Sequence, residues 1–245
     1  MFLLSKNCRP FLGATLFFVS FLFGQSHAET LRIAAGGVPP SLGNPYTATA
    51  LPATELWLAM FDGLTRLDWR GGPRPGLAVS WENPTPLTWR FTLRDSITFH
   101  NGRPVTAESV ANVFTFLLSK DAATFLVARE LTNIADVVAV APLTVQFNLR
   151  APDAILPKRL SLVMIIEPDS WTERGVDEFT IAPIGTGPYR LVDWGPGNTA
   201  PRLTAFNGNW RAPIGYTDLE YRVVGNKTSR LQALYSGQVD IATGL

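Results

Sequence analysis

The first thirty residues constrain the fold most, because they fix the compartment in which the chain folds. A basic start with Lys6 and Arg9 leads into an apolar run over 11–23 and then into the tripeptide SHA that ends at Ala28. This order is typical of a secretory signal peptide. The run of about 13 residues is shorter than the roughly 20 that a membrane-spanning helix needs. We predict export to the periplasm with cleavage between Ala28 and Glu29, and a retained membrane anchor is the alternative.

The exported chain would contain no cysteine, because the single Cys8 lies ahead of the apolar run. Neither a disulfide nor a thiolate metal site can then stabilise it, so its stability must come from a hydrophobic core. Removing residues 1–28 lowers the count of lysine plus arginine from 21 to 19 against 20 acids, a net charge of −1. Nucleic-acid binding depends on basic residues that neutralise phosphates. This charge balance argues against a nucleic-acid partner.

Short alternating or β-branched runs predict strands, and apolar spacing of three and four residues predicts helices. The predicted strands are 30–35, 88–93, 134–140, 143–149, 189–194, 202–206, 218–224 and 239–242. The predicted helices are 52–61, a helix capped by Thr106 that runs through Leu118, and one capped by Asn226 that ends at Gly237. The apolar side of the last helix is expected to be Leu231, Ala233 and Leu234. Strands and helices mix without strict alternation, which indicates an α/β (mixed α+β) fold.

Two blocks of sequence resemble a known family. The first spans 62–118 and includes DGLTRLDW, PGLAVSWE, LTWRFTLRDSITFHNGRPVTAESV and NVFTFLL. The second includes IAPIGTGPYRLVDW from Ile181, FNGNWR from Phe206 and SRLQALYSGQVDIA from Ser229. Together they cover nearly the whole chain after the signal. Both blocks are similar to the family 5 extracellular solute-binding proteins of bacterial peptide and nickel importers.

The resemblance implies a periplasmic-binding-protein-like type II lobe that carries a small inserted α+β domain. The main lobe would comprise residues 29–67 and 183–245, the insert residues 68–182, and the signal peptide residues 1–28. Family members are about twice as long as this chain. We therefore expect that the second lobe is missing and that the chain is a fragment of a two-lobed protein.

The same resemblance implies the substrate-binding component of an ABC importer. Such a protein binds a peptide or a similar small solute and delivers it to an ABC permease in the inner membrane. We expect a monomer with no cofactor. Two alternatives stay open: a nickel-complex-binding member of the family, and a sensor or interaction module derived from the lobe.

Ligands of open α/β proteins bind in crevices at strand ends, so the loop after the first strand, over 37–49, is the best candidate for a contact. The resemblance places this loop at the ligand cleft. The predicted ligand-binding residues in it are Ser41, Leu42, Asn44 and Tyr46. Phe125, after the second helix, is a weaker candidate for the rim of the cleft. An ordinary surface loop and a core phenylalanine are the structural alternatives.

No catalytic or metal-binding residues are predicted. His100 is the only histidine after the signal, and no serine lies in a G-x-S-x-G elbow. Asp95 and Glu108 flank His100, but a solvated turn followed by a helix cap would explain all three. The segment 185–188 (GTGP) lacks the lysine of a nucleotide-binding loop and is predicted to be a structural turn. Trp210 stands among polar residues, and its role is left open.

Overall fold

The computed structural model describes residues 29–47, 53–211 and 215–245. The predicted signal peptide, including Ala28, lies outside these ranges. Cleavage before Glu29 therefore stays a prediction. Glu29 itself lies next to a strand edge, where its carbonyl accepts a hydrogen bond from the Thr217 N–H at 3.1 Å.

The first sheet has five strands in the order β11-β1-β10-β9-β8. Its members are β1 (Thr30–Ala35), β8 (Tyr189–Asp193), β9 (Arg202–Ala205), β10 (Asp218–Val223) and β11 (Ile241–Ala242). β1 pairs in parallel with β10 and with β11, whereas β9 pairs antiparallel with β10 and β8. All five strands were predicted. β11 is shorter than predicted, and it lies at one edge of the sheet.

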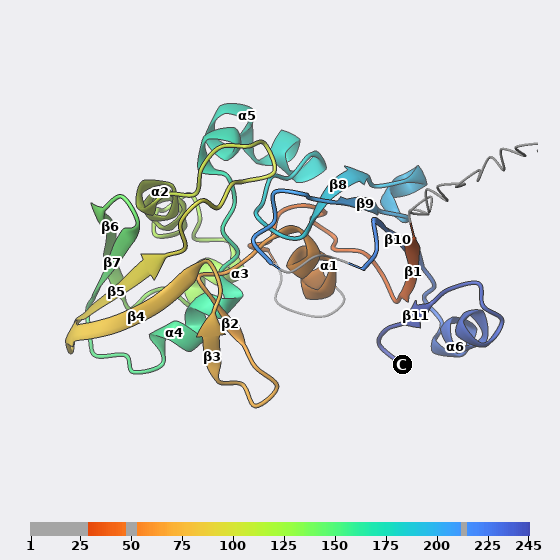
Figure 1. Cartoon of the computed structure of the whole chain (residues 1–245), viewed down its shortest axis with the longest axis horizontal. Helices are drawn as coiled ribbons and strands as arrows, with labels where there is room; N and C mark the ends of the chain where they lie inside the picture. Colours follow the sequence, from red (N-terminus) through yellow and green to blue (C-terminus); the bar gives the residue numbers. More distant parts are fainter. Residues whose placement is uncertain (1–28, 48–52, 212–214) are drawn as a thin grey trace, which may run out of the picture.

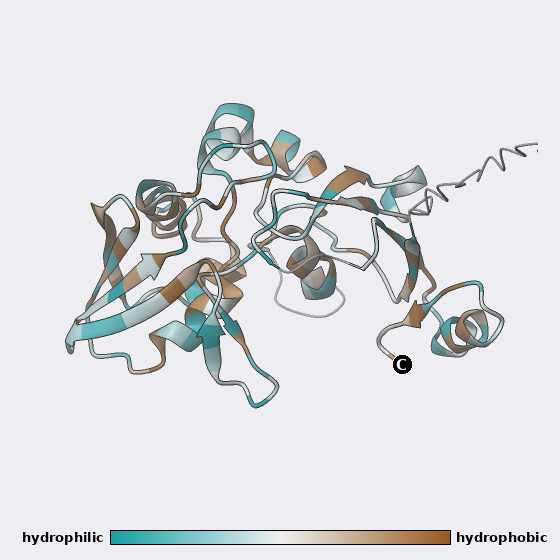
Figure 2. Ribbon diagram, in the orientation of Figure 1, coloured by the Kyte–Doolittle hydropathy of each residue, from teal (hydrophilic) through white to brown (hydrophobic). Residues whose placement is uncertain are grey.

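The second sheet has four antiparallel strands in the order β4-β5-β7-β6. They are β4 (Ala78–Thr85), β5 (Thr88–Leu93), β6 (Ile134–Ala141) and β7 (Thr144–Leu149). Phe147 contacts Phe91 and also Phe114 of helix α2 (Ala107–Leu117), with ring centroids 5.3 and 4.8 Å apart. This edge-to-face packing closes the core of the sheet. β4 was not predicted; it is largely exposed, and Figure 2 shows hydrophilic colouring at its outer end.

Helix α2 begins where the sequence predicted. The Thr106 hydroxyl accepts a hydrogen bond from the Ser109 N–H at 3.1 Å, and the Ser109 hydroxyl accepts one from the Thr106 N–H at 3.0 Å. This reciprocal cap satisfies two N–H groups that the helix leaves without partners. The predicted apolar face is also confirmed, since Val110, Val113 and Leu117 are buried.

The remaining elements lie between the strands of the two sheets in the chain. They are α1 (Ala53–Met60), the β2 (Thr65–Leu67) and β3 (Pro73–Pro75) hairpin, α3 (Leu126–Arg129), α4 (Leu156–Arg159), α5 (Pro168–Ile181) and α6 (Lys227–Tyr235), with 3-10 turns at Leu160–Leu162 and Pro196–Asn198. Figure 1 shows the two sheets at opposite ends of the molecule, with α1 between them and α6 at the far end beside β11. Of these elements, only α1 and α6 were predicted.

The predicted apolar side of α6 is only partly buried. Asn226 caps the helix as expected, its side-chain oxygen accepting from the Ser229 N–H at 3.1 Å. However, Leu231, Ala233 and Leu234 are only partly buried, and the buried residue of the helix is Arg230. The helix therefore faces the sheet with a charged side chain.

The segment around Gly185 and Gly187 is a structural turn, as predicted. A Cβ on Gly185 would lie 2.2 Å from the Met60 carbonyl oxygen, and one on Gly187 would lie 2.4 Å from the Met60 carbonyl carbon. The Gly187 N–H donates to that same carbonyl at 2.9 Å. Glycine is needed here because the end of α1 approaches the backbone closely.

His100 does not lie in a solvated turn, contrary to the prediction. Its Nδ1 accepts a hydrogen bond from the Gly185 N–H at 3.3 Å, and its Nε2 lies 3.0 Å from the Gly187 carbonyl oxygen. The imidazole also contacts the ring of Phe206, with centroids 5.0 Å apart. Burial lowers the pKa of His100 to about 4. The neutral ring of His100 therefore joins the segment that follows β5 to the turn before β8.

Candidate functional site

The carboxyl ends of the three parallel strands meet at one edge of the first sheet. β1, β10 and β11 run in the same direction, so the segments that follow them lie near one another. Each of these segments contains glycine, at Gly36, Gly225 and Gly244. Crevices at the carboxyl ends of parallel strands are the usual ligand sites of open α/β sheets. This edge is therefore the first part of the candidate site.

Arg230 of α6 binds the ends of β10 and β11, lies close to the end of β1, and was missed in the sequence. Its Nη1 donates to the carbonyls of Val224 and Gly225 at 2.6 and 3.0 Å, and its Nη2 donates to the Gly244 carbonyl at 2.7 Å. A Cβ on Gly36 would lie 3.4 Å from Nη1. Only 3% of Arg230 is exposed, and it forms no ion pair within the described part of the chain. The guanidinium satisfies carbonyls that the ends of the strands leave without partners.

The loop after β1 adopts a conformation that is rare for leucine. Leu42 has φ of 48°, in the left-handed region that bulky side chains avoid. Its carbonyl accepts a hydrogen bond from the Trp57 indole at 2.7 Å, and the next residue, Gly43, donates its N–H to the Thr180 carbonyl at 3.0 Å. These contacts hold the loop between α1 and α5. Backbone strain of this kind is often found at functional sites.

Two of the predicted ligand-binding residues turn their side chains inward. Asn44 is 3% exposed and its side-chain oxygen accepts from the Tyr46 N–H at 3.1 Å. Tyr46 is fully buried, and its hydroxyl donates to the Met164 carbonyl at 2.9 Å. Burial raises the pKa of Tyr46 well above its ordinary value. In this arrangement these two side chains support the loop, and their contact with a ligand stays a prediction.

The structure brings Tyr46 and Phe125 together although they are 79 positions apart in the numbering. Their ring centroids are 6.3 Å apart, and both rings also contact Trp171, at 5.7 and 6.4 Å. Phe116 completes the group, with its centroid 5.2 Å from that of Trp171. This aromatic cluster joins the loop after β1 to α2, α3 and α5.

Ser41, Leu42 and Phe125 are partly exposed. The Ser41 hydroxyl lies 3.2 Å from the Asn44 carbonyl and also forms a short hydrogen bond with the Thr47 hydroxyl. Since no ligand accompanies the chain, the contact that we predict for these three residues stays a prediction.

An apolar hollow of about 180 Å³ lies beside this loop. Val127, which lines it, donates its N–H to the Tyr46 carbonyl at 3.3 Å. The hollow is open, because Ile155 and Leu162 on its wall are 53% and 51% exposed. Its other lining residues are Leu67, Glu130, Leu131, Lys158, Arg159 and Val163. An apolar surface with charged groups on it is the kind of surface that accepts a solute side chain.

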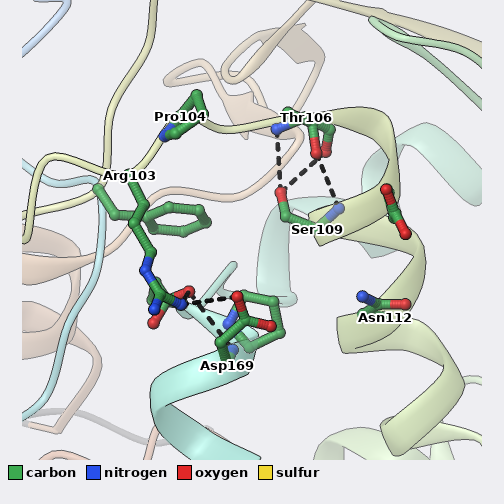
Figure 3. A pocket seen from close by; sticks show the side chains of 10 residues that line it. Arg103, Pro104, Thr106, Ser109, Asn112 and Asp169 are labelled. Carbon is green, nitrogen blue, oxygen red and sulfur yellow. Dashed lines mark hydrogen bonds and ion pairs between the residues drawn. The ribbon is translucent and has the colours of Figure 1, made fainter.

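A second hollow, of about 290 Å³, lies between the starts of α2 and α5 and is polar. Figure 3 shows Arg103 and Asp169 on one side of it and the cap of α2 on the other. Glu167 begins α5 by accepting from the Ser170 N–H at 2.8 Å. Burial acts to raise the pKa of Glu167, but these hydrogen bonds and the charge of Arg103 outweigh it, so the pKa lies below its ordinary value. The carboxylates of Glu167 and Asp169 are occupied in capping and ion pairing.

Within residues 29–47, 53–211 and 215–245, no three histidine, cysteine, aspartate or glutamate residues gather in a way that could hold a metal ion. The helices of the same ranges include none with the length and apolar character needed to cross a membrane.

The chain is similar to proteins of known sequence and structure. HTH-type transcriptional regulator SgrR of Yersinia pestis is 34% identical over 150 residues, which are 60% of this chain and 25% of the regulator. The solute-binding protein MoaA of A. tumefaciens R10, solved with mannopinic acid, is 26% identical with a TM-score of 0.78, over 88% of this chain and 45% of MoaA. DppA of Helicobacter pylori, solved with the peptide STSA, is 22% identical with a TM-score of 0.74, over 88% of this chain and 46% of DppA.

The chain thus spans about half the length of these solved proteins and a quarter of the regulator. The match to the solved structures confirms the fold expected from the sequence, which is that of a type II periplasmic-binding-protein lobe. The profile of the family described as "Bacterial extracellular solute-binding proteins, family 5 Middle" matches residues 72–245. The chain belongs to the family 5 bacterial extracellular solute-binding proteins.

Proposed function

We propose that the chain is the solute-binding component of an ABC importer. It binds a peptide or a similar small solute in the periplasm and delivers it to a permease in the inner membrane. The observation that carries this proposal is the loop after β1, which lies at the sheet edge where ligands of such folds bind. The open apolar hollow between β2, α3 and α4 adds a surface for a solute side chain. The ligand is recognised by shape and hydrogen bonds and is released without chemical change.

The proposal includes a division of the chain into two units. Residues 29–67 and 183–245 form the main lobe, and residues 68–182 form the insert. The separate sheets support this division, because the first sheet uses residues 30–35 and 189–242 and the second uses residues 78–149. The ligand meets the main lobe through Ser41 and Leu42 and the insert through Phe125.

Uptake of labelled di- to tetrapeptides tests the importer role. Cells that lack the gene should lose uptake, and the gene supplied in trans should restore it. Leu162→Lys places a charge in the apolar hollow and should reduce the restored uptake by about tenfold, since burying an unpaired ammonium is costly. Val140→Lys is the matched control, because Val140 is 48% exposed on β6, outside the residues that line the hollow. Equal uptake by the two variants would remove the hollow from the proposal.

A sensor module is the second candidate, and the similarity to SgrR favours it. A sensor would leave peptide uptake intact when the gene is deleted and would instead change the transcription of other genes. Fractionation by osmotic shock separates the candidates further, because the importer component should be released with the periplasmic proteins. Uptake that is unchanged in the deletion strain, together with altered transcription, would reverse the order of the two candidates.

A further inference from the structure

Three arginines surround the indole of Trp210. The guanidinium carbons of Arg66, Arg94 and Arg211 lie 5.3, 4.4 and 5.5 Å from the ring centroid. Arg66 belongs to β2, Arg94 follows β5, and Trp210 and Arg211 follow β9. We call these four residues, together with Asp62, the Trp210 cluster. The cluster therefore joins the two sheets at a point that the proposed function does not use.

The positive charges of the cluster exceed its negative charge. Asp62 is its single carboxylate; it pairs with Arg211 and accepts hydrogen bonds at 3.1 Å from the Trp210 indole and from the Thr186 hydroxyl. Neither Arg66 nor Arg94 forms an ion pair with a carboxylate anywhere in the described ranges. The segments outside those ranges, 1–28, 48–52 and 212–214, contain no aspartate or glutamate in their sequence. Two of the three cations thus lack a carboxylate from this chain.

Some donors of the cluster are also unused. The Nε groups of Arg94 and Arg211 are buried and have no acceptor among the described residues. The pKa of Arg66 is lowered, first by burial and then by the charge of Arg211. Stacking on the indole stabilises a guanidinium but supplies no hydrogen-bond acceptor. Arg66 is exposed, so a small molecule can reach the cluster from solvent.

We propose that the Trp210 cluster binds a small oxyanion, a carboxylate or a phosphate group, beside Arg66 and Arg94. The planar guanidinium presents paired N–H donors that match the oxygens of such a group. The anion supplies the missing negative charge. This proposal does not depend on the importer function, because the cluster shares no residue with the loop after β1 or with the apolar hollow.

Fluorescence of the purified chain tests the proposal, because the probe residue lies in the cluster. Inorganic phosphate and succinate are titrated separately, with sodium chloride adjusted to hold the ionic strength constant. The Trp210→Phe variant identifies the part of the signal that comes from Trp210. We expect a saturable change with at least one of the two anions, and the stronger response tells which oxyanion the site prefers.

Arg94→Gln and the more exposed Arg66→Gln should each weaken the affinity by about tenfold, the loss expected for one charged hydrogen bond. Arg90→Gln is the matched control, since Arg90 is an exposed strand arginine paired with Gln146 outside the cluster. Its affinity should stay within about twofold of the wild-type value. The proposal is overturned if neither anion gives a saturable change by about 10 mM, or if both cluster variants bind as tightly as Arg90→Gln.

Discussion

Replacing His100 with glutamine should change how stability depends on pH. In the folded chain the pKa of His100 is about 4, because burial disfavours the charged imidazole. The neutral ring accepts from the Gly185 N–H through Nδ1, so Nε2 carries the proton and donates to the Gly187 carbonyl. Protonating Nδ1 would break the first of these bonds and place a buried cation beside a backbone donor.

The sign and the size of the effect follow from the two pKa values. Between the folded pKa of about 4 and the ordinary pKa of 6.5, the unfolded chain binds more protons than the folded one. The free energy of unfolding therefore rises with pH through this window and reaches its full value above it. From pH 7 to pH 5 the loss attributable to His100 is about 2 kcal/mol. His100→Gln removes this dependence while an amide can still bond to the turn.

Urea unfolding at pH 7 and at pH 5 measures the effect. The wild-type chain should lose about 2 kcal/mol more than His100→Gln over this interval. NMR gives a direct check, because a chain processed before Glu29 holds a single imidazole, and the variant assigns that signal in any case. An imidazole that titrates at about pH 6 or above, or equal losses in the two proteins, would refute the burial argument.

Arg230→Met should lower the free energy of unfolding by about 2–4 kcal/mol, because three carbonyls lose a charged donor. Lys227→Met, at an exposed position of the same helix, should change it by less than about 0.5 kcal/mol. Urea unfolding compares the two variants. Tyr46→Phe removes a buried hydrogen bond and should cost about 1–2 kcal/mol in the same assay, so a value near zero would contradict its role. Gly187→Ala forces a Cβ against the carbonyl of Met60 and should cost about 1–3 kcal/mol. An unchanged thermal midpoint would show that the turn can shift.

The elements that the sequence predicted are those with strong local signals. β5 alternates, so Phe91 and Leu93 are buried while Arg90 between the strand's inward positions is exposed. α2 combines a cap at Thr106 with apolar spacing over several turns. In both cases the spacing of apolar residues repeats within one element, because one face of that element is buried. No knowledge of the distant chain is needed to predict such segments.

The elements that were missed lack such a pattern. α5 is 14 residues long but polar on average, and Gly175 within it has φ of 76°. It begins at Pro168, with Glu167 as its cap, which is a readable start signal. β2 and β3 are three residues each, and their pairing of Thr65 with Pro75 depends on a turn rather than on hydrophobic alternation. Short pairs of this kind are specified by tertiary contacts.

The location of the ligand site stays a prediction, and the contacts within it could not be predicted from the sequence for a related reason. The rule that ligands lie at strand ends pointed to the loop after β1. The rule could not tell which side chains of the loop turn inward. The direction of a side chain depends on distant partners such as Met164, which is 118 positions from Tyr46. Arg230 was not singled out in the sequence. β10 and β11 end in glycine-containing segments whose carbonyls need a donor, and a long cationic side chain on the helix between the two strands can satisfy both ends. The glycines therefore indicate a role for Arg230. This inference can be made only once β1, β10 and β11 are known to be parallel neighbours.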